Sequence, residues 1–185
     1  MKRISIEMPL TNEVIQSLKV GDHVLLSGYI YTGRDAAHIR FSKALEKGEP
    51  LPFDPQGQTI YYVGPTPKKP GYPIGSAGPT TSTRMDAHTP LLLEKGLKGM
   101  IGKGRRSPEV RKAIQKHKAV YFGAIEGTAA LLCKCIEEAE VIAYEDLASE
   151  AVFRLKLKNF PAIVVNDIHG DDLYDDDENK YKISP

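Results

Sequence analysis

A run of hydroxyl and charged side chains follows a Gly-Pro turn at residues 78–86 and is the part of the sequence best suited to chemistry. It reads G-P-T-T-S-T-R-M-D, so Thr80, Thr81 and Arg84 stand together ahead of a stretch with helical spacing. Free backbone N–H groups at the start of a helix favour anions, and hydroxyl groups add hydrogen bonds. The planar guanidinium of Arg84 suits a carboxylate. The run therefore predicts a site for an anionic ligand.

Two further segments combine a strand-like run, a glycine turn and cationic side chains. Residues 31–38 read Y-T-G-R-D-A-A-H and place Arg34 and His38 four apart near a predicted helix start, where both can share one face. Residues 99–108 read G-M-I-G-K-G-R-R-S-P and place Lys103 between glycines, ahead of a helix N-cap. Strand-to-helix turns are where α/β proteins usually place their chemistry. The recurrence of such segments strengthens the interpretation of residues 78–86 as an anion site.

Each segment also has an ordinary structural interpretation. Residues 78–86 can be a helix N-cap with a surface arginine, and the two basic turns can be solvated loops. His38 is the one side chain in these segments that titrates near neutral pH, which suits proton transfer. It can equally be a helix-face histidine that is hydrogen-bonded to a neighbour. The residues alone leave these alternatives open.

Hydrophobic periodicity and turn signals predict a single α/β domain over residues 1–185, with helices packed on a sheet. Helices are expected at about 11–18, 35–47, 82–95, 107–117 and 127–138, and strands at about 23–31, 59–64, 98–101, 119–123, 139–144, 151–157 and 161–166. A Pro- and Gly-rich stretch at 50–79 is expected to form loops that present the run at 78–86. The acidic run that begins at Asp171 is expected to be a solvated tail, about 171–185.

Composition excludes several functional classes. The formal net charge of +1 argues against a general nucleic-acid binder, and no apolar run approaches the ~20 residues that span a membrane. The N-terminus lacks the apolar core of a signal peptide. Two cysteines do not make a disulfide framework. We therefore expect a cytoplasmic protein.

Four elements together resemble a known family: T-G-R-D-A-A-H, G-P-T-T-S-T-R-M-D, G-K-G-R-R-S and Y-F-G-A-I-E-G-T-A-A-L-L. Their order and spacing are similar to those of the beta subunit of iron–sulfur hydro-lyases, the class I fumarate hydratases and L-tartrate dehydratases. The resemblance covers almost the whole chain and departs at Glu126-Gly127-Thr128, where Gly-Gly-Pro is expected. It implies a swivelling β/β/α domain, whereas the residue pattern by itself reaches only a one-domain α/β fold.

The resemblance also implies a function, the reversible hydration of fumarate to malate or the dehydration of tartrate. Arg34, Thr81, Arg84 and Lys103 would bind a small dicarboxylate substrate. The threonine of G-P-T-T, here Thr80, would occupy the proton-abstracting position. A neutral threonine is a poor base, so this role needs a depressed pKa or a relay, and the choice between Thr80 and His38 stays open.

An iron–sulfur cluster is not expected on this chain. A [4Fe–4S] cluster that leaves one iron open for substrate is held by three thiolates, and the sequence has only Cys133 and Cys135. Within a predicted helix, residues two apart point roughly 200° away from each other. The resemblance implies that the cluster sits on a separate alpha subunit, in a heterotetramer with this chain.

Two readings outside this function remain open. The chain can be a stand-alone α/β enzyme that binds a phosphorylated or carboxylated anion, which activity of the isolated chain without iron would favour. It can also be a non-catalytic regulatory module, for which retained partner binding combined with indifference to substitution of Arg84 would be the sign. The sequence does not separate fumarate from tartrate as the substrate.

Overall fold

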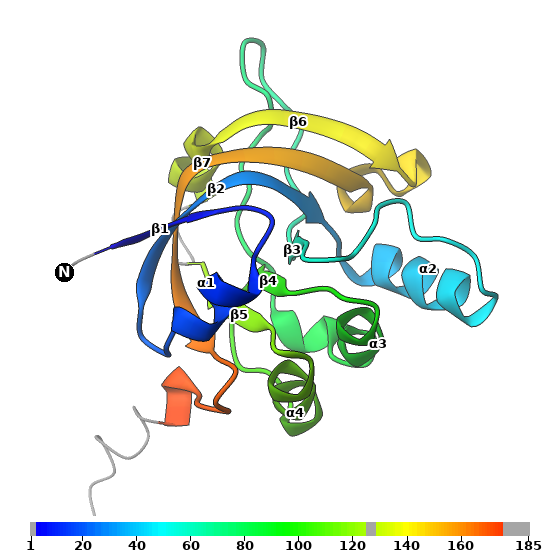
Figure 1. Ribbon diagram of the computed structural model, residues 1–185. Helices are drawn as coiled ribbons and strands as arrows, with labels where there is room; N and C mark the ends of the chain where they lie inside the picture. The colour runs from blue at the N-terminus through cyan, green and yellow to red at the C-terminus, as the bar shows by residue number, and fades with distance from the viewer. Residues whose placement is uncertain (1–2, 125–128, 176–185) are drawn as a thin grey trace, which may run out of the picture.

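A sheet of 7 strands forms the frame of the computed structural model, which describes residues 3–124 and 129–175 (Figure 1). The strands are β1 (Ile4–Glu7), β2 (His23–Thr32), β3 (Thr59–Tyr61), β4 (Gly99–Gly102), β5 (Val120–Gly123), β6 (Ile136–Ala143) and β7 (Val152–Asn166). The α-helices are α1 (Asn12–Ser17), α2 (Asp35–Glu46), α3 (Thr89–Glu94), α4 (Pro108–His117) and α5 (Ala129–Leu132). Short 3-10 helices are η1 (Ser82–Met85), η2 (Cys133–Cys135) and η3 (Glu145–Glu150).

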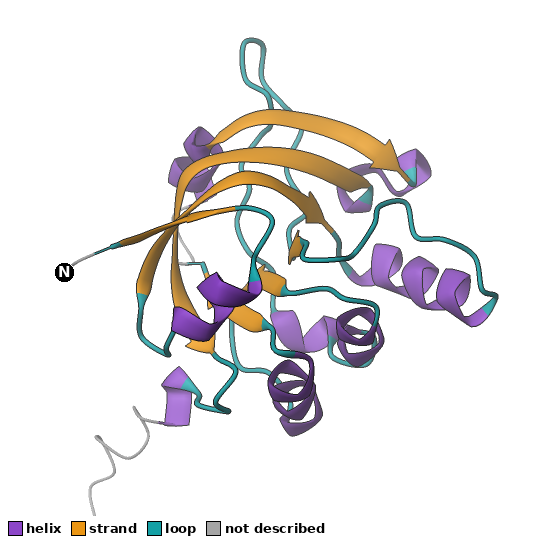
Figure 2. Cartoon of the chain, in the orientation of Figure 1, coloured by secondary structure: helices purple, strands orange, loops and turns teal. Residues whose placement is uncertain are grey.

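The sheet is mixed and closes on itself. Strands β1 to β5 pair in parallel with their neighbours in chain order, and β7 runs antiparallel to β5, β6 and β2. Because β7 bridges β5 and β2, the strands β2, β3, β4, β5 and β7 form a closed ring, visible as a strong curve in Figure 2. The α/β class predicted from the sequence is confirmed.

Alternating side chains fill two cores, one on each face of the curved sheet. Tyr61 and Phe122 belong to the core inside the ring, whereas their chain neighbours Tyr62 and Tyr121 belong to the core beneath the helices. Successive strand residues point to opposite faces, so each strand supplies both cores. Parallel strands that are covered on both sides read as continuous apolar runs, as V-Y-F-G does in β5.

Helices α2, α3 and α4 cover one face of the parallel strands (Figure 1). Helix α4 shows how the sequence sets its limits: the Ser107 side chain accepts a hydrogen bond from the Val110 N–H, and Pro108 follows at the first position. It ends at His117, and the next residue, Lys118, takes the left-handed conformation with φ 51°. No helix among residues 3–124 and 129–175 is long and apolar enough to cross a membrane.

Two helix predictions were too long. The helix expected at 82–95 is the 3-10 turn η1 followed by the separate helix α3, and Pro90 lies in the first turn of α3. Proline cannot donate to a preceding turn, so the helix restarts there. The helix expected at 127–138 ends early, because β6 begins at Ile136. Pairing with β7, such as Glu138 opposite Lys156, overrides the helical propensity of E-E-A-E.

Other boundaries also differ from expectation. The two strands expected at 151–157 and 161–166 are one long strand, β7, which contains a left-handed residue at Asn159 (φ 52°). Strand β1 was not predicted. The acidic run is not wholly solvated, because Asp172 is buried and its carboxylate lies 3.3 Å from Arg111 Nη1. Residues 176–185 of the expected tail, and the Glu126-Gly127-Thr128 departure, lie outside the described residues.

Candidate functional site

The three segments singled out in the sequence meet at the carboxyl ends of the parallel strands. Strand β2 ends at Thr32 and leads directly to Arg34, and β4 ends at Gly102 and leads to Lys103. Residues 78–86 lie against both β3 and β4, since the Thr80 N–H donates to the Tyr62 carbonyl at 2.8 Å. This edge of a parallel sheet is where open α/β folds bind ligands.

Backbone hydrogen bonds hold the threonine run to the lysine turn. The Lys103 N–H donates to the Thr80 carbonyl at 3.3 Å, and the Ser82 N–H donates to the Lys103 carbonyl at 2.9 Å. Thr81 and Lys103 therefore stand as partners in a short parallel bridge. Thr81 is exposed, and Thr80 and Lys103 are half-buried.

A network of four charged side chains links Arg34, from residues 31–38, to Arg84, from residues 78–86. The Arg84 Nε donates to Asp35 Oδ1 at 2.8 Å. The Nη2 atom of Arg34 lies 3.7 Å from Asp35 Oδ2 and 3.4 Å from Glu150 Oε1. Asp35 therefore lies between two guanidinium groups. Arg84 is half-exposed, at 50%, and Arg34 is 21% exposed, so part of each remains accessible to an anion.

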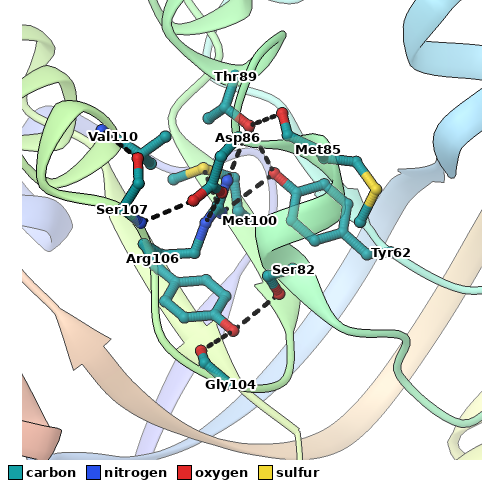
Figure 3. Close-up of polar contacts among 11 residues, drawn as sticks. Tyr62, Ser82, Met85, Asp86, Thr89, Met100, Gly104, Arg106, Ser107 and Val110 are labelled. Carbon is teal, nitrogen blue, oxygen red and sulfur yellow. Dashed lines mark hydrogen bonds and ion pairs between the residues drawn. The ribbon is translucent and has the colours of Figure 1, made fainter.

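A buried arginine, Arg106, joins residues 99–108 to residues 78–86, as Figure 3 shows. Arg106 is 4% exposed, and its Nε donates to Asp86 Oδ1 at 2.7 Å. The other oxygen of Asp86 accepts from the Ser107 N–H at 2.6 Å. Arg106 also donates to Thr89 Oγ1 at 2.8 Å and to the Tyr62 hydroxyl at 3.3 Å. A single carboxylate thus fixes both the Arg106 side chain and the start of α4.

The charge of Arg106 is kept despite its burial. Loss of solvent would by itself lower the pKa of Arg106, but the surrounding Tyr62, Asp86 and Tyr121 outweigh it and raise that pKa. The guanidinium carbon lies 5.2 Å from the Tyr62 ring centroid and 5.0 Å from that of Tyr121, which adds cation–π attraction.

The hydroxyl group of Tyr121 connects the loop that holds Ser82 to the loop that holds Gly104. Its hydroxyl donates to the Gly104 carbonyl at 2.9 Å and lies 2.8 Å from Ser82 Oγ, so the serine must donate to the tyrosine. Gly102 makes room for this contact, because a Cβ there would lie 2.0 Å from Ser82 Oγ. Burial raises the pKa of Tyr121, which keeps the hydroxyl protonated at neutral pH.

His38 lies on α2 beneath the network and is fully buried. Its Nδ1 is 2.9 Å from the Arg34 carbonyl, and since a carbonyl can only accept, Nδ1 carries the proton. Burial lowers the pKa of His38 to about 4, with the neighbouring His88 and Arg106 acting in the same direction. The expectation that His38 titrates near neutral pH is therefore wrong. Its Nε2 is buried without a hydrogen-bond partner among the described residues.

The free energy of unfolding should depend on pH because His38 is neutral in the folded chain. The pKa of His38 is about 4 in the folded chain, against 6.5 for an unperturbed histidine. The contribution of the neutral His38 to the free energy of unfolding is fully present above pH 6.5. It is lost as the pH falls toward 4, and the loss is on the order of 3 kcal/mol. Denaturant unfolding of the wild type and of His38→Asn between pH 7 and 4 should give a steeper loss for the wild type. Parallel profiles would show that His38 does not stay neutral in the fold.

Several structural residues of the site were not among the sequence predictions. Arg106 and Asp86 lie inside two of the motifs, and their buried pairing could not be told from a pair of surface charges. Tyr62 and Tyr121 gave no polar signal because they read as strand residues. Glu150 lies outside every motif.

The cysteines lie away from the charged network. Cys133 and Cys135 lie in the 3-10 helix η2, not in a longer α-helix, and both pack against the core inside the ring. The Cys133 thiol donates to the Ala130 carbonyl at 3.2 Å, and burial raises the pKa of Cys135. A raised pKa disfavours the thiolate form of Cys135 that a metal ligand needs. No group of three or more metal-binding side chains occurs within residues 3–124 and 129–175. The described residues thus offer no set of three thiolates for a [4Fe–4S] cluster.

Comparison with known proteins identifies a family that matches almost the whole chain. The family model described as Fumarase C-terminus matches residues 1–177. Fumarate hydratase 2 of Leishmania major is 36% identical over 176 residues, which cover 93% of this chain and 31% of that protein. The anaerobic class I fumarate hydratase of Escherichia coli is 36% identical over 183 residues, which cover 96% of this chain and 33% of that protein.

These matches span only about a third of the fumarate hydratases. A protein of matching length is the putative L(+)-tartrate dehydratase subunit beta of Methanocaldococcus jannaschii, which is 37% identical over 177 residues, 92% of this chain and 91% of that protein. With a family model over almost its whole length and a relative that it covers nearly completely, the chain belongs to the Fumarase C-terminus family.

Proposed function

We propose that this chain is the beta subunit of a hydro-lyase that adds water to fumarate or removes it from malate or tartrate. The observation that carries the proposal is the meeting of Arg34, Arg84 and Lys103 with a threonine run at one edge of the sheet. A dicarboxylate needs cations and hydrogen-bond donors for both of its ends, and this edge offers both.

The substrate-binding residues would be Arg34, Thr81, Arg84 and Lys103. The two arginines are already ordered by Asp35, so little conformational entropy would be lost when they bind a carboxylate. Thr81 is exposed beside Lys103 and can donate a hydroxyl hydrogen bond. We therefore expect this site to bind a small dianion.

Proton transfer is assigned to Thr80 rather than His38. His38 is fully buried with a pKa of about 4, whereas Thr80 is half-buried with its backbone fixed by two hydrogen bonds. The weak basicity of a threonine hydroxyl requires a relay or strong electrostatic support in the complete site. His38 would then support Arg34 through its carbonyl instead of exchanging protons with substrate.

The rest of the site would come from an alpha subunit that carries the [4Fe–4S] cluster, in a heterotetramer. Two cysteines are too few for such a cluster, and fumarate hydratases that match this chain have about two thirds of their length outside the match. The cluster would supply the Lewis acid for the departing hydroxide. The closed sheet with helices on one face supports a swivelling β/β/α domain, which could move against that subunit.

Reconstitution tests the proposal. The chain is co-expressed with a protein that matches the missing two thirds of the fumarate hydratases, iron and sulfide are added without oxygen, and fumarate, malate and tartrate are assayed. Activity is expected only from the assembled complex. Activity of the isolated chain without iron would favour a stand-alone anion-binding enzyme. An assembled complex whose activity is indifferent to substitution of Arg84 would favour a regulatory module.

Arg84→Lys should lower the specificity constant of the assembled enzyme roughly thirtyfold, which corresponds to a loss of about 2 kcal/mol in transition-state stabilisation. Lysine keeps the charge but loses the planar fork, of which Nε donates to Asp35 Oδ1. Steady-state kinetics with malate measures the effect. Arg3→Lys serves as the control, because Arg3 is exposed just ahead of β1, at the opposite end of the parallel strands. Equal kinetics for the two variants would make Arg84 a surface residue.

A further inference from the structure

The charged network at the end of β2 includes an acidic side chain from a distant part of the chain. Glu150 is the last residue of η3. Its Oε2 accepts from the Ala36 N–H at 3.0 Å, and its Oε1 lies 3.4 Å from Arg34 Nη2. One carboxylate therefore contacts both the backbone of the first turn of α2 and the guanidinium of Arg34.

The first turn of α2 fixes this carboxylate in place. Arg34 is the N-cap residue of α2 and makes no side-chain capping hydrogen bond. Amides of a first helical turn lack intrahelical partners, and Glu150 gives Ala36 the acceptor that a serine or aspartate N-cap would give. The positive end of the helix dipole favours the negative charge as well. Glu150 is thus held by backbone, not only by a flexible arginine.

The segment that carries Glu150 is anchored on both sides. Beyond it, the buried Thr32 hydroxyl donates to the Ala151 carbonyl at 3.2 Å and accepts from the Phe153 N–H at 2.9 Å. Before it, Asp146 forms an ion pair with Arg40 of α2. These contacts fasten η3 to the end of β2 and to α2, so the distance from Glu150 to Arg34 is set by the fold.

Arg34 has little space on its other side. A Cβ at Gly64 would lie 2.6 Å from Arg34 Nη1, so the guanidinium is packed against that backbone. Its remaining acidic neighbour, Asp35, lies at 3.7 Å and also holds Arg84. The guanidinium is confined between Gly64 and Glu150, with 21% of the side chain exposed.

We infer that Glu150 is a positioning residue that acts through Arg34. It holds the guanidinium at the carboxyl end of β2 in the orientation in which the exposed part can bind a carboxylate. That this carboxylate belongs to a dicarboxylate substrate rests on the proposed function. The control of Arg34 by Glu150 is a property of this chain alone and can be tested on it.

The first test measures the reactivity of Arg34 in the isolated chain with phenylglyoxal, which modifies accessible arginines, followed by mass mapping of the peptides. Glu150→Gln removes the charge but keeps an acceptor, and Glu150→Asp keeps the charge but withdraws the carboxylate by one methylene. Both should raise the modification rate of Arg34 by about fivefold. Glu145→Gln, at an exposed acid of the same segment, should leave that rate unchanged, and Arg154 serves as the internal reference. Unchanged Arg34 reactivity in both Glu150 variants overturns the inference.

The second test uses the assembled enzyme. Glu150→Gln should raise KM by about tenfold with a smaller change in kcat, and should add nothing further in an Arg34→Lys background. A merely structural role would instead lower the melting temperature and the active fraction, with effects that add to those of Arg34→Lys, and that result also overturns the inference. If the wild-type assembly hydrates none of the three acids, the proposed function fails, whereas Arg34 reactivity still decides the role of Glu150.

Discussion

Replacing Asp86 by alanine is expected to lower the free energy of unfolding by about 3–5 kcal/mol, because it leaves a buried charge without its partner. The Arg106 side chain is 0% exposed, and its Nε–Asp86 Oδ1 distance is 2.7 Å. The same substitution removes the acceptor of the Ser107 N–H at the start of α4. Denaturant unfolding of the isolated chain, followed by circular dichroism, measures the loss.

Two further variants separate the buried charge from other causes. Asp146→Ala removes a carboxylate that is 65% exposed and pairs with Arg40, so it should cost less than about 1 kcal/mol. The double variant Asp86→Leu with Arg106→Met replaces the pair by apolar side chains and should recover much of the stability. If Asp86→Ala is no more destabilising than Asp146→Ala, the Arg106 charge has another means of compensation.

The convergence of the three segments follows from rules that a sequence carries. Two of the segments come directly after strand-like runs, and parallel strands bring their carboxyl ends to one edge, so Arg34 and Lys103 lie at the same edge of the sheet. Ser107 and Pro108 mark the start of α4 for the same local reason. These features depend on chain direction and capping. The start of α4 was predicted from the residue pattern, whereas the joining of the three segments in one site was implied by the family resemblance.

The contacts within the site depend on distances that no local rule supplies. Arg106 and Arg105 stand side by side in the sequence, yet Arg106 is buried and Arg105 is 40% exposed. His38 has the residue type of a proton carrier, and only its packing makes its pKa low. The first residues of β6, 136–138, were predicted as the end of a helix, but their pairing with β7 outweighs local propensity. Glu150 could be found only once η3 was placed beside α2.

Thr80→Ala is expected to cut the turnover of the assembled enzyme by roughly 10²–10⁴-fold, the range for loss of a general acid–base group. Substrate binding should change much less, because a proton-transferring group acts mainly in the transition state. Two backbone hydrogen bonds, from Thr80 to Tyr62 and from Lys103 to Thr80, do not involve the side chain, so the loop should keep its position. The direct measurement is exchange of the malate C3 proton with deuterated solvent.

Two matched variants complete this prediction. Thr83→Ala removes an exposed hydroxyl of the same run and should exchange at the wild-type rate. His38→Asn should impair stability more than exchange, because His38 is buried, neutral and bonded to the Arg34 carbonyl. A normal exchange rate in Thr80→Ala with a slow one in His38→Asn would reverse the assignment. Normal rates in both would place the base on the partner subunit, and this chain would then contribute only the binding of the dianion and the closure of the site.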